Sequence, residues 1–533
     1  MNQDFETKIY ERIPPVERFF ITIVVVSGVF MAILDTTVVE IILPKIMAPL
    51  ATDIYGVQWV VTSYMIASAI FLLLIEPLAK TVGLKWTFIT GETLFTTASF
   101  LCANASTLGH MIIFRSLQGI GEALIIASGE TIIFTIYPPE KRGLGMGIYA
   151  LAVSFAPALG PTLGGYLTEH FSWHHVFLIN LPVGIIGVIL SLAILPEVVE
   201  KKEKFSLNFI GFIAMGIATI NLLTLLSKGQ QKGWFSSPMI VNLYTACALF
   251  YFLFFISEYF SKNKLIEWEI FKFKEFTVAI AIYLFILGLS MYQVFYLLPI
   301  YYERLRLLGT FDTGLHILPM ALTIGIVSIV SGILSDKIGE QNVLVASSII
   351  LIIGTAIFLP KLDYYTPKKI STLYTIPWAI GVGMFFAPIT TLALRNLGKY
   401  TNLGVSLLHY IRFIGGSFGT AIATNTLQKA LAKHHEGILS EQFKSIDYIT
   451  IRLNEWTYIA KQMFPGELAE KKVKALLNGV TQLMALNDAL KDTFASSAYF
   501  AFLGLLFLIP LLVRGKKNEE ENNRRTSQGT IRT

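Results

Sequence analysis

Charge is scarce in this sequence. Of its 533 residues only 15% are Asp, Glu, Lys or Arg, against roughly a quarter in soluble proteins. Hydrophobic residues make up 54%, and the mean hydropathy is +0.62. A soluble core cannot bury this much apolar surface, so the composition argues against a large soluble enzyme.

Cysteine and the usual catalytic motifs are equally sparse. The two cysteines, Cys102 and Cys247, both fall in apolar stretches, so no disulfide framework is predicted. The sequence has no His/Cys cluster with metal-ligand spacing, no phosphate-binding Gly-x-x-x-x-Gly-Lys loop and no nucleophile elbow. We therefore expect no metal, no cofactor and no ATP hydrolysis by this chain alone.

What the sequence does contain is long apolar blocks. A bilayer requires about 20 residues for each helical crossing. Fourteen blocks of suitable length occur at 18–43, 57–79, 86–104, 109–136, 143–168, 175–195, 207–227, 238–260, 276–300, 313–335, 341–360, 371–394, 403–427 and 493–514. The sequence thus predicts an all-α integral membrane protein with 14 transmembrane helices.

The connections between these blocks predict an orientation. If the N-terminus is cytoplasmic, the inside segments hold about twenty Lys and Arg, and the short outside connections hold fewer than ten. An even number of spans places both termini inside. The net charge of +6 reflects this bias, so no nucleic-acid partner is expected.

Two cytoplasmic loops, 76–88 and 332–344, are similar in sequence. Leu78, Ala79 and Gly83 align with Leu334, Ser335 and Gly339. Lys80 and Asp336 lie in the same two loops. The first loop joins spans two and three and the second joins spans ten and eleven, which suggests two repeats of six spans that rock against each other.

This repeat predicts the domain organisation. We expect a cytoplasmic arm (1–17), an N-terminal six-helix bundle (18–195), a linker with two inserted spans (196–275), a C-terminal six-helix bundle (276–514) and a cytoplasmic tail (515–533).

The outside connection at 428–492 is unusually long. Its stretches 427–442, 452–464 and 467–490 are helix-like, with a turn signal at Pro465-Gly466. We predict an extracytoplasmic hairpin of amphipathic helices within the C-terminal bundle. It either caps its own bundle or forms a docking surface for a partner.

Ionisable residues interrupt some of the apolar blocks. Asp35 lies in the first span, and a charged residue at the centre of a span costs about 2.5–3.5 kcal/mol on insertion scales. Arg115, Gln118 and Glu122 share one face of the fourth span because they are three and four residues apart. At 1.5 Å per residue, Asp35 lies about 13 Å and Arg115 about 9 Å below the outer boundary. We therefore predict an Asp35–Arg115 pair bridged by Gln118, which either exchanges protons or statically joins two helices.

Other acids receive separate predictions. Glu40 lies near the outer end of the first span, where it is either hydrated or in contact with substrate. Glu122 lies near mid-membrane, where hydration is harder, and is predicted to be a functional carboxylate. Glu76, Glu92 and Glu130 lie near the cytoplasmic boundary and are expected to reach the aqueous phase.

Small residues mark the fifth and thirteenth spans. Ala156, Gly160 and Gly164 recur every four residues and predict close helix contact, while Pro161 predicts a bend. Arg412 introduces a similar run of glycines in the thirteenth span.

Together these motifs resemble the major facilitator superfamily, and within it the fourteen-span drug:proton antiporters of the EmrB/QacA type. The stretch LDTTVVEIILP resembles the span-one signature, with Asp35 at its acidic position. RSLQGIGEAL is similar to the span-four motif, and ALGPTLGGYL to the antiporter motif, matching at Gly160, Pro161, Gly164 and Gly165. SWHHVFLINLPVG resembles the opening of span six, and HYIRFIGGSFGTAI the span-thirteen motif with Arg412.

The sequence also departs from that family. Glu76 and Lys80 stand where the family usually has Gly and Asp, and the Lys is similar to the EmrB-like branch. That resemblance implies a periplasmic membrane-fusion adaptor, an outer-membrane channel reached through it, and a bacterial inner-membrane location. The carboxylates of Glu40 and Glu122 are additional to the family pattern and leave proton stoichiometry and substrate charge open.

The resemblance implies an exporter driven by the proton gradient that works by alternating access. Asp35, Arg115 and Glu122 are then the candidates for proton coupling. The candidates for contact with amphipathic substrates are Gln118, Glu40, Tyr292, Tyr296 and Phe385. Lys80, Gly83, Asp336, Gly339 and Arg412 belong with the span-five motif as conformational residues. The alternatives are a transporter, exporting or importing, of one metabolite such as a siderophore or fatty acid, and a polytopic lipid-modifying enzyme.

Overall fold

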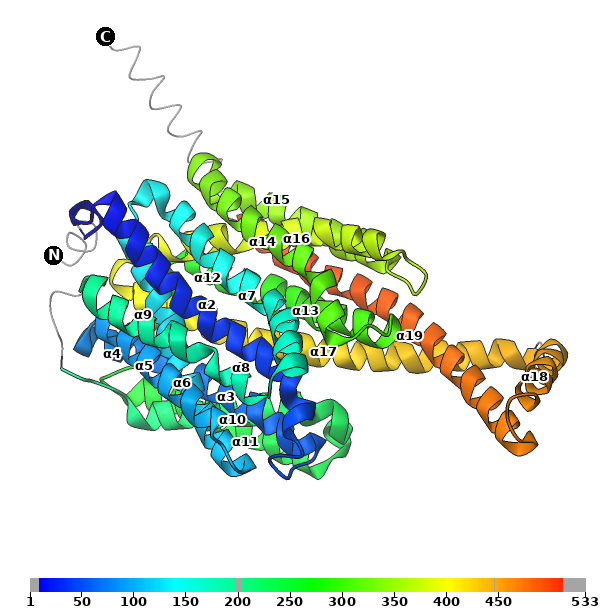
Figure 1. Cartoon of the computed structure of the whole chain (residues 1–533). Coiled ribbons are helices and arrows are strands. Elements are labelled where there is room, and N and C mark those ends of the chain that lie inside the picture. Colours follow the sequence, from blue (N-terminus) through cyan, green and yellow to red (C-terminus); the bar gives the residue numbers. More distant parts are fainter. Residues whose placement is uncertain (1–8, 198–203, 445, 511–533) are drawn as a thin grey trace, which may run out of the picture.

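The computed structural model describes residues 9–197, 204–444 and 446–510. Within these ranges the chain folds into helices and no strands, and most of the helices run side by side in one elongated bundle (Figure 1). The predicted tail at 515–533, and parts of the predicted arm and linker, lie outside the described residues.

The N-terminal six predicted spans correspond to eight α-helices, some of them joined end to end. These are α2 (Pro15–Ile46), α3 (Ile54–Phe71), α4 (Ile75–Val82), α5 (Leu84–Ala103), α6 (Leu108–Ile136), α7 (Arg142–His170), α8 (His174–Leu178) and α9 (Asn180–Ile194). Short 3₁₀ turns, η1 (Leu72–Leu74) and η2 (Pro139–Lys141), precede α4 and α7.

The rest of the chain begins with the two inserted helices. These are α10 (Phe209–Lys232) and α11 (Pro238–Phe260). The following helices are α12 (Lys274–Ile282), α13 (Tyr292–Ile300), α14 (Thr310–Ile338), α15 (Glu340–Ile353), α16 (Lys368–Leu394), α17 (Thr401–Lys444), α18 (Ile446–Lys461) and α19 (Gly466–Leu506). The intervening π segments are η5 (Tyr283–Met291), η6 (Tyr301–Leu305) and η7 (Gly354–Phe358), and the 3₁₀ turns are η3 (Trp234–Ser236), η4 (Trp268–Lys272), η8 (Leu359–Lys361) and η9 (Gly398–Tyr400).

Ten helical segments of the described chain are long and apolar enough to cross a membrane. Helix α7 adds an eleventh if its two parts, Pro139–Pro157 and Thr162–His170, are counted as one span bent by 43°. Pro161, for which the sequence predicts a bend, lies at this position. Helices α5, α17 and α19 occupy the other three predicted positions without meeting the same criterion, so the number of 14 spans stays a prediction.

The two similar loops share one backbone conformation. Gly83 has a φ of +95° and Gly339 a φ of +88°, a region that favours glycine. The N–H of Gly83 donates to the carbonyl of Ala79 at 3.1 Å, and that of Gly339 to the carbonyl of Ser335 at 3.0 Å. The aligned residues thus occupy equivalent positions in the two turns.

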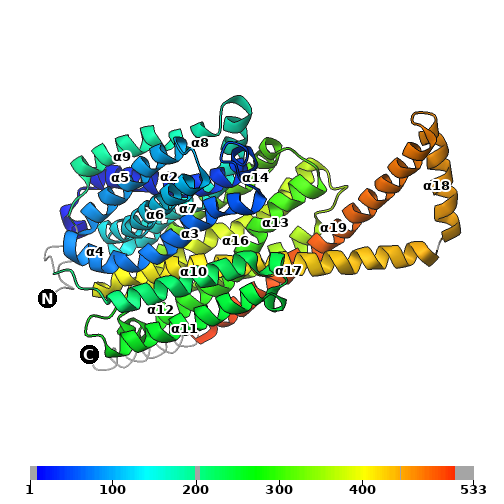
Figure 2. The same ribbon diagram turned by 90° about the horizontal axis from the view of Figure 1, so that it is seen from below.

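The halves meet through helices α7 and α17. Helix α7 packs along α14 and against α16, and α17 packs against α3, α4 and α6. A methyl group on Gly332 would approach the backbone oxygen of Gly143 to 2.0 Å, which shows how closely α7 and α14 approach. The inserted α10 lies beside both α3 and α17, and Figure 2 shows it along this side of the bundle with α11.

Helices α17 and α19 run on beyond the bundle and carry α18 at their far end (Figures 1 and 2). Helix α18 contacts α17 and α19, and His434 Nε2 lies 2.8 Å from Asp492 Oδ2 at the base of the projection. The segment therefore extends away from the bundle and does not fold back over it as a cap.

Candidate functional site

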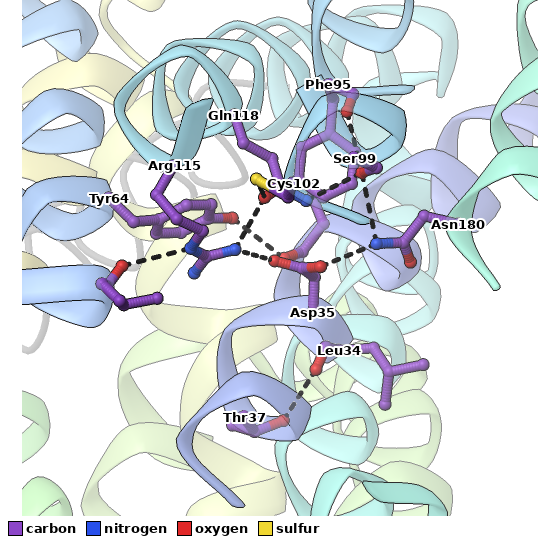
Figure 3. A network of polar contacts seen from close by, with 12 residues as sticks. Leu34, Asp35, Thr37, Tyr64, Phe95, Ser99, Cys102, Arg115, Gln118 and Asn180 are labelled. Atoms are coloured by element: carbon purple, nitrogen blue, oxygen red, sulfur yellow. Dashed lines mark hydrogen bonds and ion pairs between the residues drawn. The ribbon is translucent and has the colours of Figure 1, made fainter. Parts of the chain in front are cut away.

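Asp35 and Arg115 meet inside the N-terminal half (Figure 3). Asp35 lies in the middle of α2 and Arg115 in the first third of α6. Arg115 Nη1 donates to Asp35 Oδ2 at 2.5 Å, and neither side chain is exposed. The depth argument placed the two groups at similar depths, and a buried charge requires a partner.

Three further contacts fix the arginine. Its Nε donates to the carbonyl of Val60 on α3 at 3.2 Å, and its Nη1 also donates to Gln118 Oε1 at 2.7 Å. The guanidinium lies 4.0 Å from the centre of the Tyr64 ring. Helices α3 and α6 approach closely because Gly119 has no side chain: a methyl group there would lie 2.3 Å from the carbonyl oxygen of Tyr64.

The other oxygen of Asp35 has a partner that the sequence analysis did not assign. Asn180 at the start of α9 donates from Nδ2 to Asp35 Oδ1 at 2.7 Å. Ser99 on α5 lies 3.4 Å from the same Asn180 nitrogen and accepts from Gln118 Nε2 at 2.8 Å. Gln118 therefore supports Arg115 and Ser99 and does not bridge Arg115 to Asp35. The signal available in the sequence was the polar side chain of Asn180 in the apolar stretch before Pro182.

The buried network links the charge of Asp35 to the positions of five helices. Ionised Asp35 compensates Arg115 and accepts from Asn180. Protonation would remove that compensation and leave a buried guanidinium, which is strongly unfavourable. Arg115 Nη2 has no hydrogen-bond partner among the described residues. The contacts of both carboxylate oxygens therefore depend on the charge of Asp35.

A second group of polar side chains lies between the halves and is less tightly connected. It consists of Glu122, Glu40, Tyr292 and Arg412. Tyr292 lies within electrostatic range of Arg412, Glu122 and Glu40. The side chain of Glu122 is 3% exposed, with Oε2 unpartnered in the described chain, whereas Glu40 is exposed. Acids from α2 and α6 thus face an arginine and a tyrosine from the other half.

The predicted aromatic walls separate into two kinds. Tyr292 and Tyr296 are partly exposed. Phe385 is fully buried and packs against Tyr283, with ring centres 6.0 Å apart. It is therefore a core residue here, and its neighbour Phe386 lines a nearby cavity instead.

The conformational residues join neighbouring elements. Lys80 pairs with Glu76 at 2.9 Å and with Glu267 at 3.1 Å. Asp336 accepts from the backbone N–H groups of Gly143 and Leu144 at 2.8 and 3.0 Å, and so caps α7 from the other half.

The span-five motif lies against both halves. A methyl group on Gly160 would meet Thr37 Oγ1 at 2.2 Å, and one on Gly165 would meet Phe311 of α14 at 3.1 Å. Gly164 is buried. The side chain of Pro161 lies outside the described atoms.

The prediction that Glu76, Glu92 and Glu130 reach the aqueous phase is wrong. They are 5%, 0% and 2% exposed. Lys80 pairs with Glu76, Ser191 donates to Glu92 at 2.8 Å, and Glu130 contacts His409 Nε2 of α17. A neighbouring helix packs over each acid. The position of a residue along its span does not show whether another helix covers it.

Comparison with known proteins identifies the family to which most of the chain is similar. The model of the Major Facilitator Superfamily matches residues 25–420. The chain is 27% identical to the multidrug export protein EmrB of Escherichia coli over 422 residues, covering 78% of this chain and 81% of that protein. It is 29% identical to the fatty acid resistance protein FarB of Neisseria gonorrhoeae, over 78% of this chain and 82% of FarB.

The fold agrees with these matches. The crystal structure of the human organic anion transporter MFSD10 superimposes with a TM-score of 0.57 at 13% identity, over 93% of this chain and all of MFSD10. The matched family consists of transporters and not of enzymes, and EmrB is named as a multidrug export protein. This chain is a multi-pass membrane protein that belongs to the Major Facilitator Superfamily and is related to the multidrug transporters of the EmrB type.

Proposed function

We propose that the chain is a proton-coupled exporter of amphipathic compounds. The observation that carries this proposal is the buried contact of Asp35 with Arg115 at 2.5 Å. Both oxygens of this acid contact donors from other helices, so a proton that binds there would change contacts to several helices. Protons entering the cell would then drive outward movement of substrate by alternating access.

Substrate would bind between the halves near mid-membrane. Glu122 and Glu40 supply negative charge there, and Tyr292 and Tyr296 supply aromatic surface that is partly exposed. Buried Glu122 has a carboxylate oxygen without a hydrogen-bond partner in the described chain. We therefore assign Glu122 to recognition of cationic substrates, and Gln118 to support of the neighbouring Arg115.

The projection formed by α17, α18 and α19 is the proposed contact with a partner. Leu476, Val480 and Met484 lie four residues apart on α19 and are 58%, 43% and 53% exposed. An apolar helix face of this kind favours association with another helix. We propose that it docks a periplasmic membrane-fusion adaptor, through which substrate reaches an outer-membrane channel.

This arrangement requires the bacterial inner membrane, with both termini in the cytoplasm and α18 in the periplasm. A second candidate function is transport of one metabolite, favoured by the similarity to a protein named for fatty acid resistance. Both functions use the same proton site and differ in substrate range.

Inverted membrane vesicles test the direction and the energy source. With the protein in its predicted orientation, an acid-inside gradient should drive accumulation of an amphipathic dye into the vesicles. A protonophore should abolish that accumulation, and vesicles without the protein are the control. Accumulation that needs no proton gradient, or movement in the opposite direction, would contradict the proposal. Saturation by one metabolite with no competition from other amphiphiles would favour the second function.

A further inference from the structure

A second buried pair joins the two halves. Glu130 lies near the end of α6 in the N-terminal half, and His409 lies in the first part of α17 in the C-terminal half. The carboxylate Oε2 of Glu130 contacts His409 Nε2, and the two side chains are 2% and 3% exposed. Because alternating access requires the halves to separate at each face in turn, this contact has to break once in each cycle.

The pair borders a small cavity between the halves. His409, Arg412 and Glu130 line it together with Tyr149 of α7, Tyr283 of η5 and Thr390 of α16. Arg412 lies nearly one turn beyond His409 and is 7% exposed, with Nε unpartnered in the described chain. Tyr149 donates to the carbonyl of Ile126, and Tyr283 lies 3.3 Å from Thr390 Oγ1. The other charged or titratable groups that act on Arg412 are Glu122 and Tyr292.

The sum of the charges indicates which protonation state favours the closed contact. Among the groups that line the cavity, an ionised Glu130, a neutral His409 that donates from Nε2 and a charged Arg412 sum to zero. Glu122, which also acts on Arg412, is not part of this lining. One added proton gives a net charge of +1, whether it binds to the carboxylate or to the imidazole. An imidazolium would also have a second N–H at Nδ1, which has no acceptor in the described chain. Buried charge without compensation is costly, so the added proton destabilises the closed contact.

We propose that Glu130 and His409 form a second proton-binding site, which holds the halves together at the predicted cytoplasmic side and releases them when it takes up a proton. This rests on the proposed proton-coupled function. The proton-loaded protein would then favour the state that opens toward the cytoplasm, where the proton can leave. The two protons of a cycle, at Asp35 and at this pair, would act on different contacts.

The test measures opening without transport. Spin labels are attached to cysteines that replace Glu140 of η2 and Asn396 after α16, and the distance between them reports the separation of the halves. Both positions are exposed, whereas the native Cys102 and Cys247 are buried. Lowering the pH from 8 to 5 should raise the ratio of long to short distances in the otherwise unaltered protein. One linked proton limits the rise to about tenfold for each pH unit.

Three variants sharpen the result. Glu130→Gln cannot ionise and should show long distances at both pH values. His409→Gln keeps a neutral donor toward Glu130 and should remain closed at pH 8. It provides a second test in case Glu130→Gln folds poorly. Glu92→Gln is the matched control, because Glu92 is a buried acid bonded to Ser191 within one half, and it should respond as the unaltered protein does.

Distances that do not change with pH, or that change equally in Glu130→Gln, would overturn the second site while leaving proton-driven export intact. Loss of the proton requirement in vesicle transport, with a normal pH response of the distances, would instead remove the proposed function and keep a pH-sensitive contact.

Discussion

Gly83 and Gly339 occupy the same backbone conformation at equivalent turns of the two halves, with φ of +95° and +88°. Each ends one helix and begins the next without a break, at α4–α5 and at α14–α15. The repeat visible in the sequence is therefore also a repeat of local geometry.

Gly339 allows a clean measurement of what this conformation contributes. No atom lies within 4 Å of a methyl group built on Gly339, so Gly339→Ala adds backbone strain and no clash. This region of positive φ is essentially restricted to glycine and costs another residue about 1–3 kcal/mol, so the thermal midpoint in detergent should fall accordingly. Gly309→Ala is the control because Gly309 is equally open but has a φ of −63°. Equal midpoints for both variants would contradict the strain.

Arg115 tests the compensation of charge at the central pair. Arg115→Gln should destabilise the folded protein by about 3–5 kcal/mol, because it leaves Asp35 charged and buried. The double variant with Asp35→Asn removes both charges and should recover most of that loss. Chemical unfolding in detergent of the two single variants and the double variant measures the coupling. Additive losses would show that the two side chains do not depend on each other.

Glu122 tests the assignment to substrate charge. Glu122→Gln keeps the shape of the side chain and removes its charge, so export of cationic dyes should fall more than export of neutral compounds. Initial rates in vesicles, compared between two compounds of similar size, measure the difference. Equal losses in both classes would assign Glu122 to proton coupling or to packing.

The apolar face of α19 tests whether the projection docks a partner. Replacing Leu476, Val480 and Met484 together with Ser should abolish co-purification with the membrane-fusion adaptor and leave substrate exchange in proteoliposomes unchanged. Replacing Lys471 and Lys474, which are exposed on the same helix, with Ser is the matched control.

Exchange of 430–490 for a short Gly/Ser linker extends this test to the whole projection. The bundle should still insert and exchange substrate. Adaptor binding that survives either change, or collapse of the bundle in the linker variant, would rule out docking by this segment.

The sequence was informative wherever one helix carried its own signal. Asp35 and Arg115 stand out because each interrupts an apolar span, and helix rise gives their depth. The turns at Gly83 and Gly339 could be aligned because both are local.

The contact of Glu130 with His409 could not be predicted in this way. The two residues are 279 positions apart and come from different halves, and the packing of α6 against α17 is not encoded in either helix alone. The contact of Asn180 with Asp35 was not predicted for a related reason, since only the position of α9 beside α2 brings its amide to Asp35. The burial of Phe385 likewise depends on which face of α16 is covered.

The central claim is that Asp35 carries the transported proton. Proteoliposomes that contain Asp35→Asn, with Glu92→Gln as a buried-acid control, test it through simultaneous measurement of substrate flux and internal pH. We predict that Asp35→Asn binds substrate and remains folded but shows neither exchange of substrate for protons nor the accompanying change in luminal pH, whereas Glu92→Gln shows both. Undiminished substrate/proton exchange by Asp35→Asn would contradict the account.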